Sequence, residues 1–245
     1  MEGIRCVQIN LHHCKAATAL LARQLQLDKF DIALIQEPYL YKGVIKGLGG
    51  TGGNLYYLCS TNDARTCIYA RNGLNAMPIN NFCSRDLTTI RVLTGGADAR
   101  KAVILASAYL PYEDKEPPAT CIRELVNYGT RDNLDLILGC DANAHHTVWG
   151  SSNVNRRGEA VLDFVVSSSL QLLNSGNKPT FVEARRAEVI DITLASNRTS
   201  RKIHDWHVSE EITGSDHRYI CFRYSPVRTP TGTALRRTPR NTNWN

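Results

Sequence analysis

The sequence lacks any hydrophobic run long enough to cross a membrane. Its longest stretch without a charged residue runs from Gly47 to Asn62 and is rich in glycine, whereas a bilayer requires about 20 mostly apolar residues. The first residues, Met1 to Cys6, also lack the apolar core of a secretory signal. From these two absences we expect a protein that works inside the cell and does not engage membranes.

The eight cysteines form no Cys-x-x-Cys pair and no compact cluster. Several lie inside apolar runs, as Cys6 and Cys140 do, which is typical of buried, reduced thiols. We therefore expect neither a disulfide framework nor a zinc site, and we expect a reducing compartment, the cytosol or the nucleus.

The positive charge is unevenly distributed. The formal net charge is +6, and residues 226–245 contain four arginines and no acidic residue, which leaves +2 for the rest. This tail is rich in Pro, Thr and Arg and is expected to be a flexible linker. The remaining body is not uniformly basic, so any contact with nucleic acid must come from local cationic loops.

Residues 1–225 are predicted to form one α/β domain. With 42% hydrophobic and 21% charged residues, the chain has the composition of a globular protein. Helical periodicity occurs at 16–27, after Pro117-Pro118 and at 158–168. The strand segments are much more numerous, which favours two sheets packed face to face with helices outside. We expect the segment 43–54, with its many glycines, to be a flexible loop. The predicted strands are 4–10, 32–36, 55–59, 66–70, 89–93, 102–109, 134–139, 170–174, 189–195 and 219–224.

Polar residues gather where several of these strands end or begin. In α/β proteins such positions can converge on one crevice. Asp141 and Asn143 lie two apart on an extended end, so their side chains point the same way. The positions concerned are Gln8-Ile9-Asn10, Gln36-Glu37-Pro38, Tyr109, Asp141-Ala142-Asn143, Asp191 and Ser215-Asp216-His217.

These residue types together suit phosphodiester hydrolysis. Glu37 with Asp216 or Asn10 offers the hard oxygen ligands that Mg²⁺ prefers. A histidine beside an aspartate can stay cationic and face a phosphate, while Asp141 could hold and deprotonate a water.

Each residue taken alone also has a purely structural explanation. Glu37 could be a solvated charge that ends a strand, and Asp141-Ala142-Asn143 could form a turn or a helix cap. Tyr109 could be a core aromatic. The pairs His12-His13 and His145-His146 invite a metal interpretation, but neighbours on extended chain point apart.

The order and spacing of the motifs resemble the exonuclease–endonuclease–phosphatase family, which includes apurinic endonucleases, DNase I and inositol 5-phosphatases. The resemblance implies a four-layered α/β sandwich and divalent-metal-dependent cleavage of phosphoesters. The matching segments are Gln8-Ile9-Asn10, Ile35-Gln36-Glu37-Pro38, Ser107-Ala108-Tyr109-Leu110-Pro111, Gly139-Cys140-Asp141-Ala142-Asn143, Val189-Ile190-Asp191-Ile192-Thr193-Leu194 and Gly214-Ser215-Asp216-His217.

The resemblance assigns a metal site to Glu37, with Asn10 and Asp216 near the ion. It implies Mg²⁺ as the cofactor, with Mn²⁺ able to substitute. The chain departs from many repair enzymes at His12, where they carry an aspartate. This departure argues against a second metal position.

The same resemblance assigns the chemistry. Asp141 would position the attacking water, and Asn143 and Tyr109 would contact the phosphate. His217 would face the phosphate and be paired with Asp191.

Within the family, Asp141-Ala142-Asn143-Ala144-His145 followed by Trp149 resembles the endonuclease domains of non-LTR retrotransposons, particularly insect elements with fixed target sites such as telomeric repeats. The resemblance implies a nuclear endonuclease, monomeric as an isolated domain, that nicks one strand of double-stranded DNA. The 3′-hydroxyl would prime a downstream reverse transcriptase domain of the same polyprotein.

DNA contacts are expected on a predicted hairpin at 182–189, whose tip carries Arg185 and Arg186. In related nucleases this hairpin is expected to enter the minor groove, which suits arginine; alternatively, Glu183 and Glu188 make it a salt-bridged turn. Further candidates for DNA contact are Arg156, Arg157 and Thr180. Two other functions remain open for the chain: a phosphatase or phosphodiesterase acting on small phosphoesters, and a catalytically silent nucleic-acid-binding module.

Overall fold

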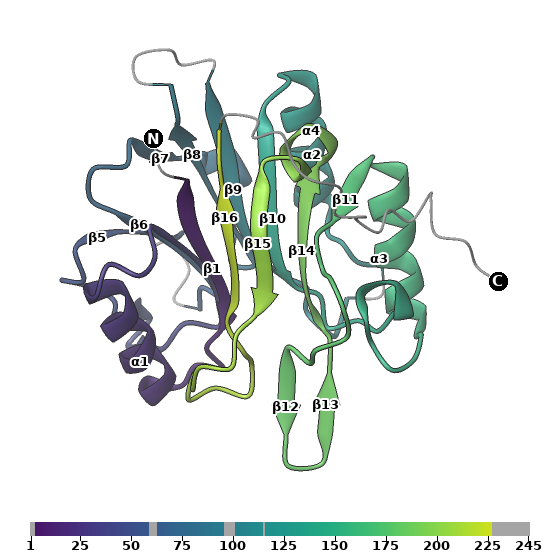
Figure 1. The fold of residues 1–245 in the computed structure, drawn as a ribbon, viewed down its shortest axis with the longest axis horizontal. Helices are drawn as coiled ribbons and strands as arrows, with labels where there is room; N and C mark the ends of the chain where they lie inside the picture. Colours follow the sequence, from purple (N-terminus) through teal and green to yellow (C-terminus); the bar gives the residue numbers. More distant parts are fainter. Residues whose placement is uncertain (1–2, 59–62, 96–100, 115, 227–245) are drawn as a thin grey trace.

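The computed structural model describes residues 3–58, 63–95, 101–114 and 116–226. Two six-stranded mixed sheets pack face to face, and helices cover their outer faces (Figure 1). This arrangement confirms the predicted fold class, a four-layered α/β sandwich. The predicted linker lies outside the described residues from position 227 onward. No helix of the described part is both long and apolar enough to span a bilayer, and the seven described cysteines are free thiols.

The first sheet contains the N-terminal strand at its centre. Its strands β1 and β2 are parallel and its other neighbours are antiparallel. In spatial order the strands are β15 (Ile203–Val208), β16 (Ile220–Tyr224), β1 (Ile4–Asn10), β2 (Ile32–Gln36), β6 (Thr66–Arg71) and β5 (Gly53–Tyr56).

The second sheet has the same number of strands and again one parallel pair, β9 with β10. In spatial order the strands are β11 (Leu170–Leu172), β14 (Asp191–Ser196), β10 (Asp135–Asp141), β9 (Ala102–Tyr109), β8 (Leu87–Leu93) and β7 (Ala76–Pro78). Two hairpins stand apart from the sheets: β3 (Leu40–Tyr41) with β4 (Val44–Ile45), and β12 (Phe181–Glu183) with β13 (Arg186–Glu188).

The helices close the two outer faces. Helix α1 (Lys15–Gln26) packs its Leu21 and Leu25 on the first sheet. Helices α2 (Thr120–Arg131) and α3 (Arg156–Ser167) pack on the second sheet through residues such as Leu125 and Phe164. The short helix α4 (Asn197–Ser200) and two 3₁₀ turns, Asn80–Phe82 and Thr147–Trp149, complete the elements.

The alternation of side chains along β1 decides which of them face the second sheet. Ile4 and Cys6 belong to the core between the sheets, whereas Val7 and Ile9 pack toward α1. Because successive residues of a strand point to opposite faces, Gln8 follows Ile4 and Cys6 into the space between the sheets, and so does Asn10.

Two buried glutamines connect the sheets there. Gln8 donates from Nε2 to the carbonyls of Cys140 and Ile192 (3.3 and 3.2 Å), and its Oε1 accepts from Thr193 Oγ1. Gln36 donates from Nε2 to Ser107 Oγ at 3.0 Å and to the Gly139 carbonyl at 3.3 Å. These bonds fix the position of one sheet relative to the other at the end where the polar residues gather.

Most predicted elements occur with shifted ends, but the prediction omitted two strands of the sheets, β7 and β15, and was wrong about the segment 43–54. Strand β7 is only three residues long, whereas the β15 sequence Ile-His-Asp-Trp-His-Val alternates and its burial alternates as an edge strand's does. The segment 43–54 is not simply a flexible loop, because it contains β4 and the start of β5, and Leu48 within it is buried in the core.

Gly139 is expected to be essential for the distance between the sheets. A Cβ at this position would lie 2.8 Å from Gln8 Oε1 and 2.8 Å from Leu34 Cδ1, and Gln8 cannot move without losing its bonds. Gly139→Ala should lower the free energy of unfolding by about 1–3 kcal/mol, measured by urea denaturation. Gly49→Ala, where nothing lies within 4 Å, is the control. Equal stability of the two variants would contradict this account.

Candidate active site

The candidate site lies where the parallel strands of both sheets end. Asn10 ends β1, Tyr109 ends β9 and Asp141 ends β10, while Glu37 follows β2 directly. Asp191 starts β14 and stands opposite Asp141 in the antiparallel register. The structure therefore brings together side chains that are more than 200 positions apart in the sequence, from Asn10 to His217, around a cleft of about 320 Å³.

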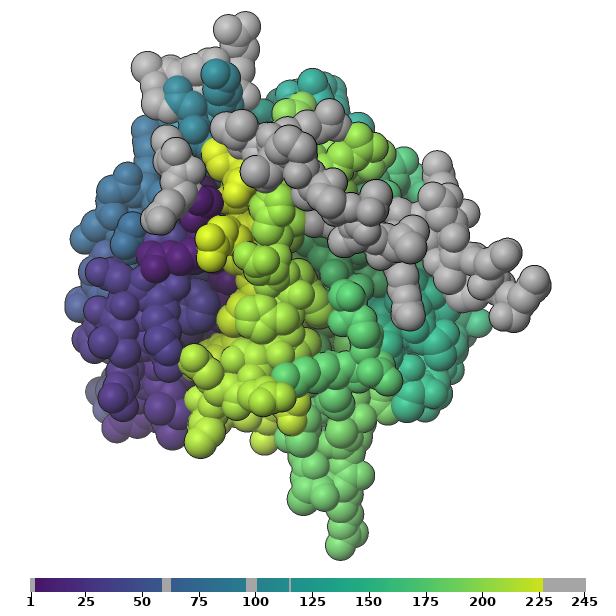
Figure 2. Space-filling view, viewed as in Figure 1, coloured from purple at the N-terminus to yellow at the C-terminus, as the bar shows by residue number. Residues whose placement is uncertain are grey.

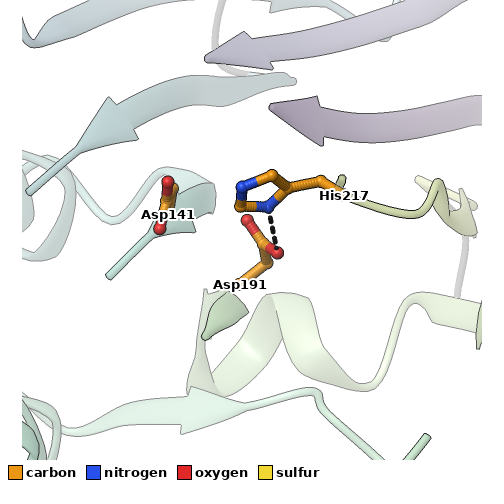
Figure 3. Close-up of side chains that lie close together, drawn as sticks. All are labelled: Asp141, Asp191 and His217. Atoms are coloured by element: carbon orange, nitrogen blue, oxygen red, sulfur yellow. Dashed lines mark hydrogen bonds and ion pairs between the residues drawn. The ribbon is translucent and has the colours of Figure 1, made fainter. Parts of the chain in front are cut away.

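His217 and Asp191 form a buried pair in this cleft (Figure 3). His217 Nδ1 lies 2.8 Å from Asp191 Oδ2, and the two residues are 5% and 2% exposed. Burial opposes a charged ring, but the charge of Asp191 and its hydrogen bond, followed by Asp141 and Glu37, raise the pKa of His217 to about 9. At neutral pH the ring is therefore an imidazolium whose Nδ1–H donates to Asp191.

Asp141 lies to one side of the His217 ring and Asp191 lies below it (Figure 3), and the three residues offer polar atoms within 4.8 Å of one another. Burial, followed by the negative charge of Asp191, raises the pKa of Asp141, while His217 and a hydrogen bond from Asn10 act against this rise. Asn10 Nδ2 donates to Asp141 Oδ2 at 2.8 Å and to Glu37 Oε2 at 3.0 Å. The amide thus holds two carboxylates near each other and connects the two sheets at the floor of the cleft.

The backbone around these carboxylates is in a conformation that few residues adopt. Glu37 and Asn143 have φ values of +44° and +46°, in the left-handed region that non-glycine residues seldom adopt; residues away from the cleft, such as Asp28 and Ser169, share this conformation. Glu37 is held by its own N–H, which donates to the Arg65 carbonyl, and by its carbonyl, which accepts from His13 N. Asn143 is held by Asp141 Oδ1, which accepts from its N–H at 3.1 Å.

Tyr109 and Asn143 form the wall of the cleft beside Asp141. Asn143 Nδ2 donates to the Leu110 carbonyl at 3.2 Å. The guanidinium of Arg65 lies 4.7 Å above the centre of the Tyr109 ring. Burial, then the charges of Glu37 and Asp141, raises the pKa of Tyr109, so its hydroxyl remains a hydrogen-bond donor at neutral pH.

The charges of the cleft fit a divalent cation. Glu37, Asp141 and Asp191 carry more negative charge than the single imidazolium of His217 compensates, and carboxylate oxygens are the ligands that Mg²⁺ prefers. Asp141, Asp191 and His217 offer atoms within 4.8 Å of one another, but Asp191 and His217 already bind each other. Glu37 is the better candidate ligand, because its Oε1 accepts no hydrogen bond from the described residues and has His13 Nε2 as its charged neighbour there, at 3.6 Å.

His12 lines the cleft together with Glu37, and Asp216 lies beside His12. His12 Nδ1 lies 2.8 Å from Asp216 Oδ2, and the Asp216 side chain is 38% exposed. An ion held by Glu37 and Asp216 would therefore have an imidazole beside it where many repair enzymes have a carboxylate. This difference follows from the presence of His12 at a position where many repair enzymes have an aspartate.

The chain is similar to endonuclease domains of known proteins. The family model described as "Endonuclease-reverse transcriptase" matches residues 103–221. The endonuclease domain of TRAS1, a telomere-specific non-LTR retrotransposon, superimposes with a TM-score of 0.75 at 26% identity, covering 90% of this chain and 98% of that domain. The chain therefore has the fold of the AP endonucleases and is similar to endonuclease domains of non-LTR retrotransposons. These similarities support a hydrolase that acts on phosphodiester bonds.

Two other known proteins are also similar to this chain. A putative 115 kDa protein of the type-1 retrotransposable element R1DM of Drosophila melanogaster is 26% identical over 234 residues, which cover 90% of this chain and 22% of that protein. The chain thus spans about a fifth of its curated relative. The fold is also that of the AP endonuclease LMAP from Leishmania major, with a TM-score of 0.71 at 12% identity over 94% of this chain and 89% of that one.

The predicted DNA-binding residues lie in different environments. Arg156 is exposed at the start of α3, and Arg185 is exposed in the turn of the β12–β13 hairpin. Arg157 donates to the carbonyls of Asn143, Leu110, Ala142, Tyr112 and Asp114. Its guanidinium is occupied in holding the loop of Asn143, so we do not retain it as a phosphate contact.

Thr180 is also placed differently from the prediction. It is fully buried, and its Oγ1 accepts hydrogen bonds from the N–H groups of Ile190 and Asp191 at 3.2 and 3.0 Å. It therefore positions Asp191 and does not face DNA. Asn174 was predicted only as the last residue of a strand. It has a similar role, because its Nδ2 donates to the Asp191 carbonyl at 3.0 Å.

Asp191→Asn is expected to lower kcat by about 10²–10⁴-fold, because the His217 ring loses the charge that keeps it protonated. The substitution lowers the pKa of His217, so the variant's rate relative to wild type should improve as the pH falls and decline as it rises. A pH series of phosphodiester cleavage rates measures this ratio.

The control is Asp205→Asn, at an exposed aspartate of β15, which should behave as wild type throughout. A ratio for Asp191→Asn that does not change with pH would mean that the aspartate has only a structural role.

Proposed function

We propose that the chain is a Mg²⁺-dependent DNA endonuclease that nicks one strand of a chromosomal target, with telomeric repeats as the expected sequence. The observation that carries the proposal is the buried His217–Asp191 pair facing Asp141 and Glu37 in one open cleft. The similarity to the TRAS1 domain supports the choice of a telomeric target.

The arrangement can divide the hydrolysis between its side chains. Asp141 holds a water in line with the phosphorus and accepts its proton, for which its raised pKa is suitable. The imidazolium of His217 and the Asn143 amide stabilise the charge that develops on the phosphate oxygens. The new P–O bond forms as the P–O3′ bond breaks, and the leaving oxygen takes a proton to become a 3′-hydroxyl. A bound Mg²⁺ at Glu37, Asn10 and Asp216, with Mn²⁺ as a substitute, supplies charge neutralisation.

The shape of the molecule favours a polymer as substrate. The β12–β13 hairpin projects from the body (Figure 2), and its residues Phe181, Glu183 and Arg186 line the cleft. Its base is bonded to the segment around His217, because Val182 N donates to the Asp216 carbonyl and Arg218 N donates to the Thr180 carbonyl, both at 2.7 Å. A projection with an exposed arginine at its turn can enter a DNA groove. Double-stranded DNA is therefore the proposed partner.

The proposal includes the setting of the reaction. The match to an endonuclease–reverse transcriptase model and to retrotransposon proteins supports a downstream reverse transcriptase domain that uses the 3′-hydroxyl as a primer. We propose that the protein acts in the nucleus and that the isolated domain is a monomer.

Nicking of supercoiled plasmid tests the activity. Wild type with Mg²⁺ should yield relaxed circles, and EDTA should abolish them. His217→Ala and Asp141→Asn should each lose several orders of magnitude in rate. Phosphate release from inositol phosphates without nicking would indicate a small-molecule phosphatase, and plasmid retardation without nicking would indicate a silent binding module.

Arg185→Ala should weaken target choice more than catalysis. Its guanidinium stands in the exposed turn of the hairpin, and a base or groove contact contributes about 1–3 kcal/mol of discrimination. Sequencing of nick positions on telomeric-repeat and random duplexes measures the preference, with the exposed Arg131→Ala as the matched control. If Arg185→Ala cuts the preferred site as selectively as wild type, the hairpin turn does not read the target.

A further inference from the structure

The two arginines of the hairpin have different surroundings. Arg185 lies in the turn, whereas Arg186 begins β13 and stands opposite Glu183 in the hairpin register. Residues that are paired across two strands share a face, so Arg186 shares its face with Phe181, two residues from Glu183. That face is turned into the cleft, which both side chains line.

Arg186 is held over the cleft from two sides. Its Nη2 lies 2.7 Å from His145 Nε2, and its guanidinium carbon lies 5.5 Å from the centre of the Phe181 ring. Phe181 in turn contacts the His217 ring edge-on at 5.0 Å between centroids. The Phe181 ring therefore contacts both the guanidinium of Arg186 and the imidazole of His217.

The contact with Arg186 defines the role of one ring nitrogen of His145. A guanidinium can only donate, so His145 Nε2 is the acceptor in this contact. Its Nδ1–H then donates to Asn153 Oδ1 at 2.8 Å. The main chain of His145 is fixed as well, because its N–H donates to Asn155 Oδ1 at 3.2 Å and its carbonyl accepts from Asn155 N at 3.0 Å.

Arg186 forms no close ion pair among the described residues, since no carboxylate oxygen there lies within 4.0 Å of its guanidinium. Its nearest acidic neighbours are on its own hairpin: Glu183 is its register partner, and its charge helps to lower the pKa of Glu188, which is bonded to Ser152. Arg186 is the one arginine or lysine among the described residues that line the cleft. The floor, by contrast, carries Glu37 and Asp141. A positive charge that is oriented, unpaired and next to the reaction site is suited to an anion brought by the substrate.

We propose that Arg186 binds a phosphate of the cut strand next to the scissile one, and that His145 is the positioning residue that aims it. This assignment rests on the proposed endonuclease function and deepens it. It separates Arg186, which contacts the backbone and holds the strand in register, from Arg185 at the turn. A backbone contact sets affinity and position and carries no base preference.

The main test is a phosphate-neutralisation scan on a short duplex that contains the preferred nick site. Single methylphosphonate linkages replace the phosphates flanking the nick one at a time, and KM and kcat are measured with Mg²⁺. Arg186→Ala should raise KM on the unmodified duplex about tenfold, the effect of losing a charged hydrogen bond, with a smaller change in kcat. One neutral linkage should raise KM for wild type and have no further effect on Arg186→Ala.

The positioning role of His145 has its own signature. His145→Ala should raise KM in the same direction, and His145→Gln, which keeps an acceptor for the guanidinium, should recover most of the loss. The double variant His145→Ala with Arg186→Ala should be no worse than Arg186→Ala alone, because the two residues act through one contact. Additive losses would show that His145 acts on the substrate independently.

Salt dependence gives a second measurement, and controls separate the possible failures. For duplex binding in EDTA, the slope of log affinity against log salt should be lower by about one for Arg186→Ala. Arg131→Ala, near the start of β10 and away from the cleft, should match wild type in all assays. If wild type nicks DNA but Arg186→Ala retains its sensitivity to every linkage, the Arg186 assignment is wrong. If wild type cuts no DNA, the proposed function itself fails.

Discussion

The site depends on the contact between the two sheets at Gln8, Gln36 and Gly139. Asn10 and Glu37 belong to one sheet, Asp141 and Asp191 to the other, and neither set can act without the other. The glutamines bond directly to carbonyls of the opposite sheet, and the missing side chain of Gly139 leaves them the space. Because buried hydrogen bonds are costly to break, this polar layer places the sheets more specifically than the apolar side chains around it could.

The same layer makes a concentration of charge tolerable. Burying Asp141 and Asp191 in register with each other is unfavourable, as the raised pKa of Asp141 shows. His217 compensates for part of this charge, and Thr180 and Asn174 hold the Asp191 backbone by hydrogen bonds. The negative charge that remains at Glu37 and Asp141 suits a cation, and the guanidinium of Arg186, which has no close ion pair among the described residues, suits an anion. The cleft is thus charged in two complementary halves, as a metal ion and a phosphodiester together would require.

The sequence predicted what local pattern and strand ends determine. The spans of β1, β2 and β9 matched the expected ranges, because alternating or continuous apolar runs identify strands directly. The polar positions that follow them were found for the same reason. Arg157 and Thr180 could not be understood in this way. Their roles depend on carbonyl and amide groups brought near by the tertiary fold, and a side chain that is bonded to five carbonyls reads in sequence as an exposed charge.

The Arg185-Arg186 pair shows the same limit of sequence-based prediction for two adjacent residues. As a dipeptide it indicates a single basic patch at the tip of a hairpin. In the structure the turn ends between the two residues, and the strand geometry sends Arg186 back toward Phe181 and His145 while Arg185 stays at the turn. A shift of the turn by one residue would exchange the two positions, since strand side chains alternate. The register of the three residue pairs in the hairpin therefore decides which arginine faces the cleft. Two adjacent arginines can hold a strand and select a site separately only if that register is fixed.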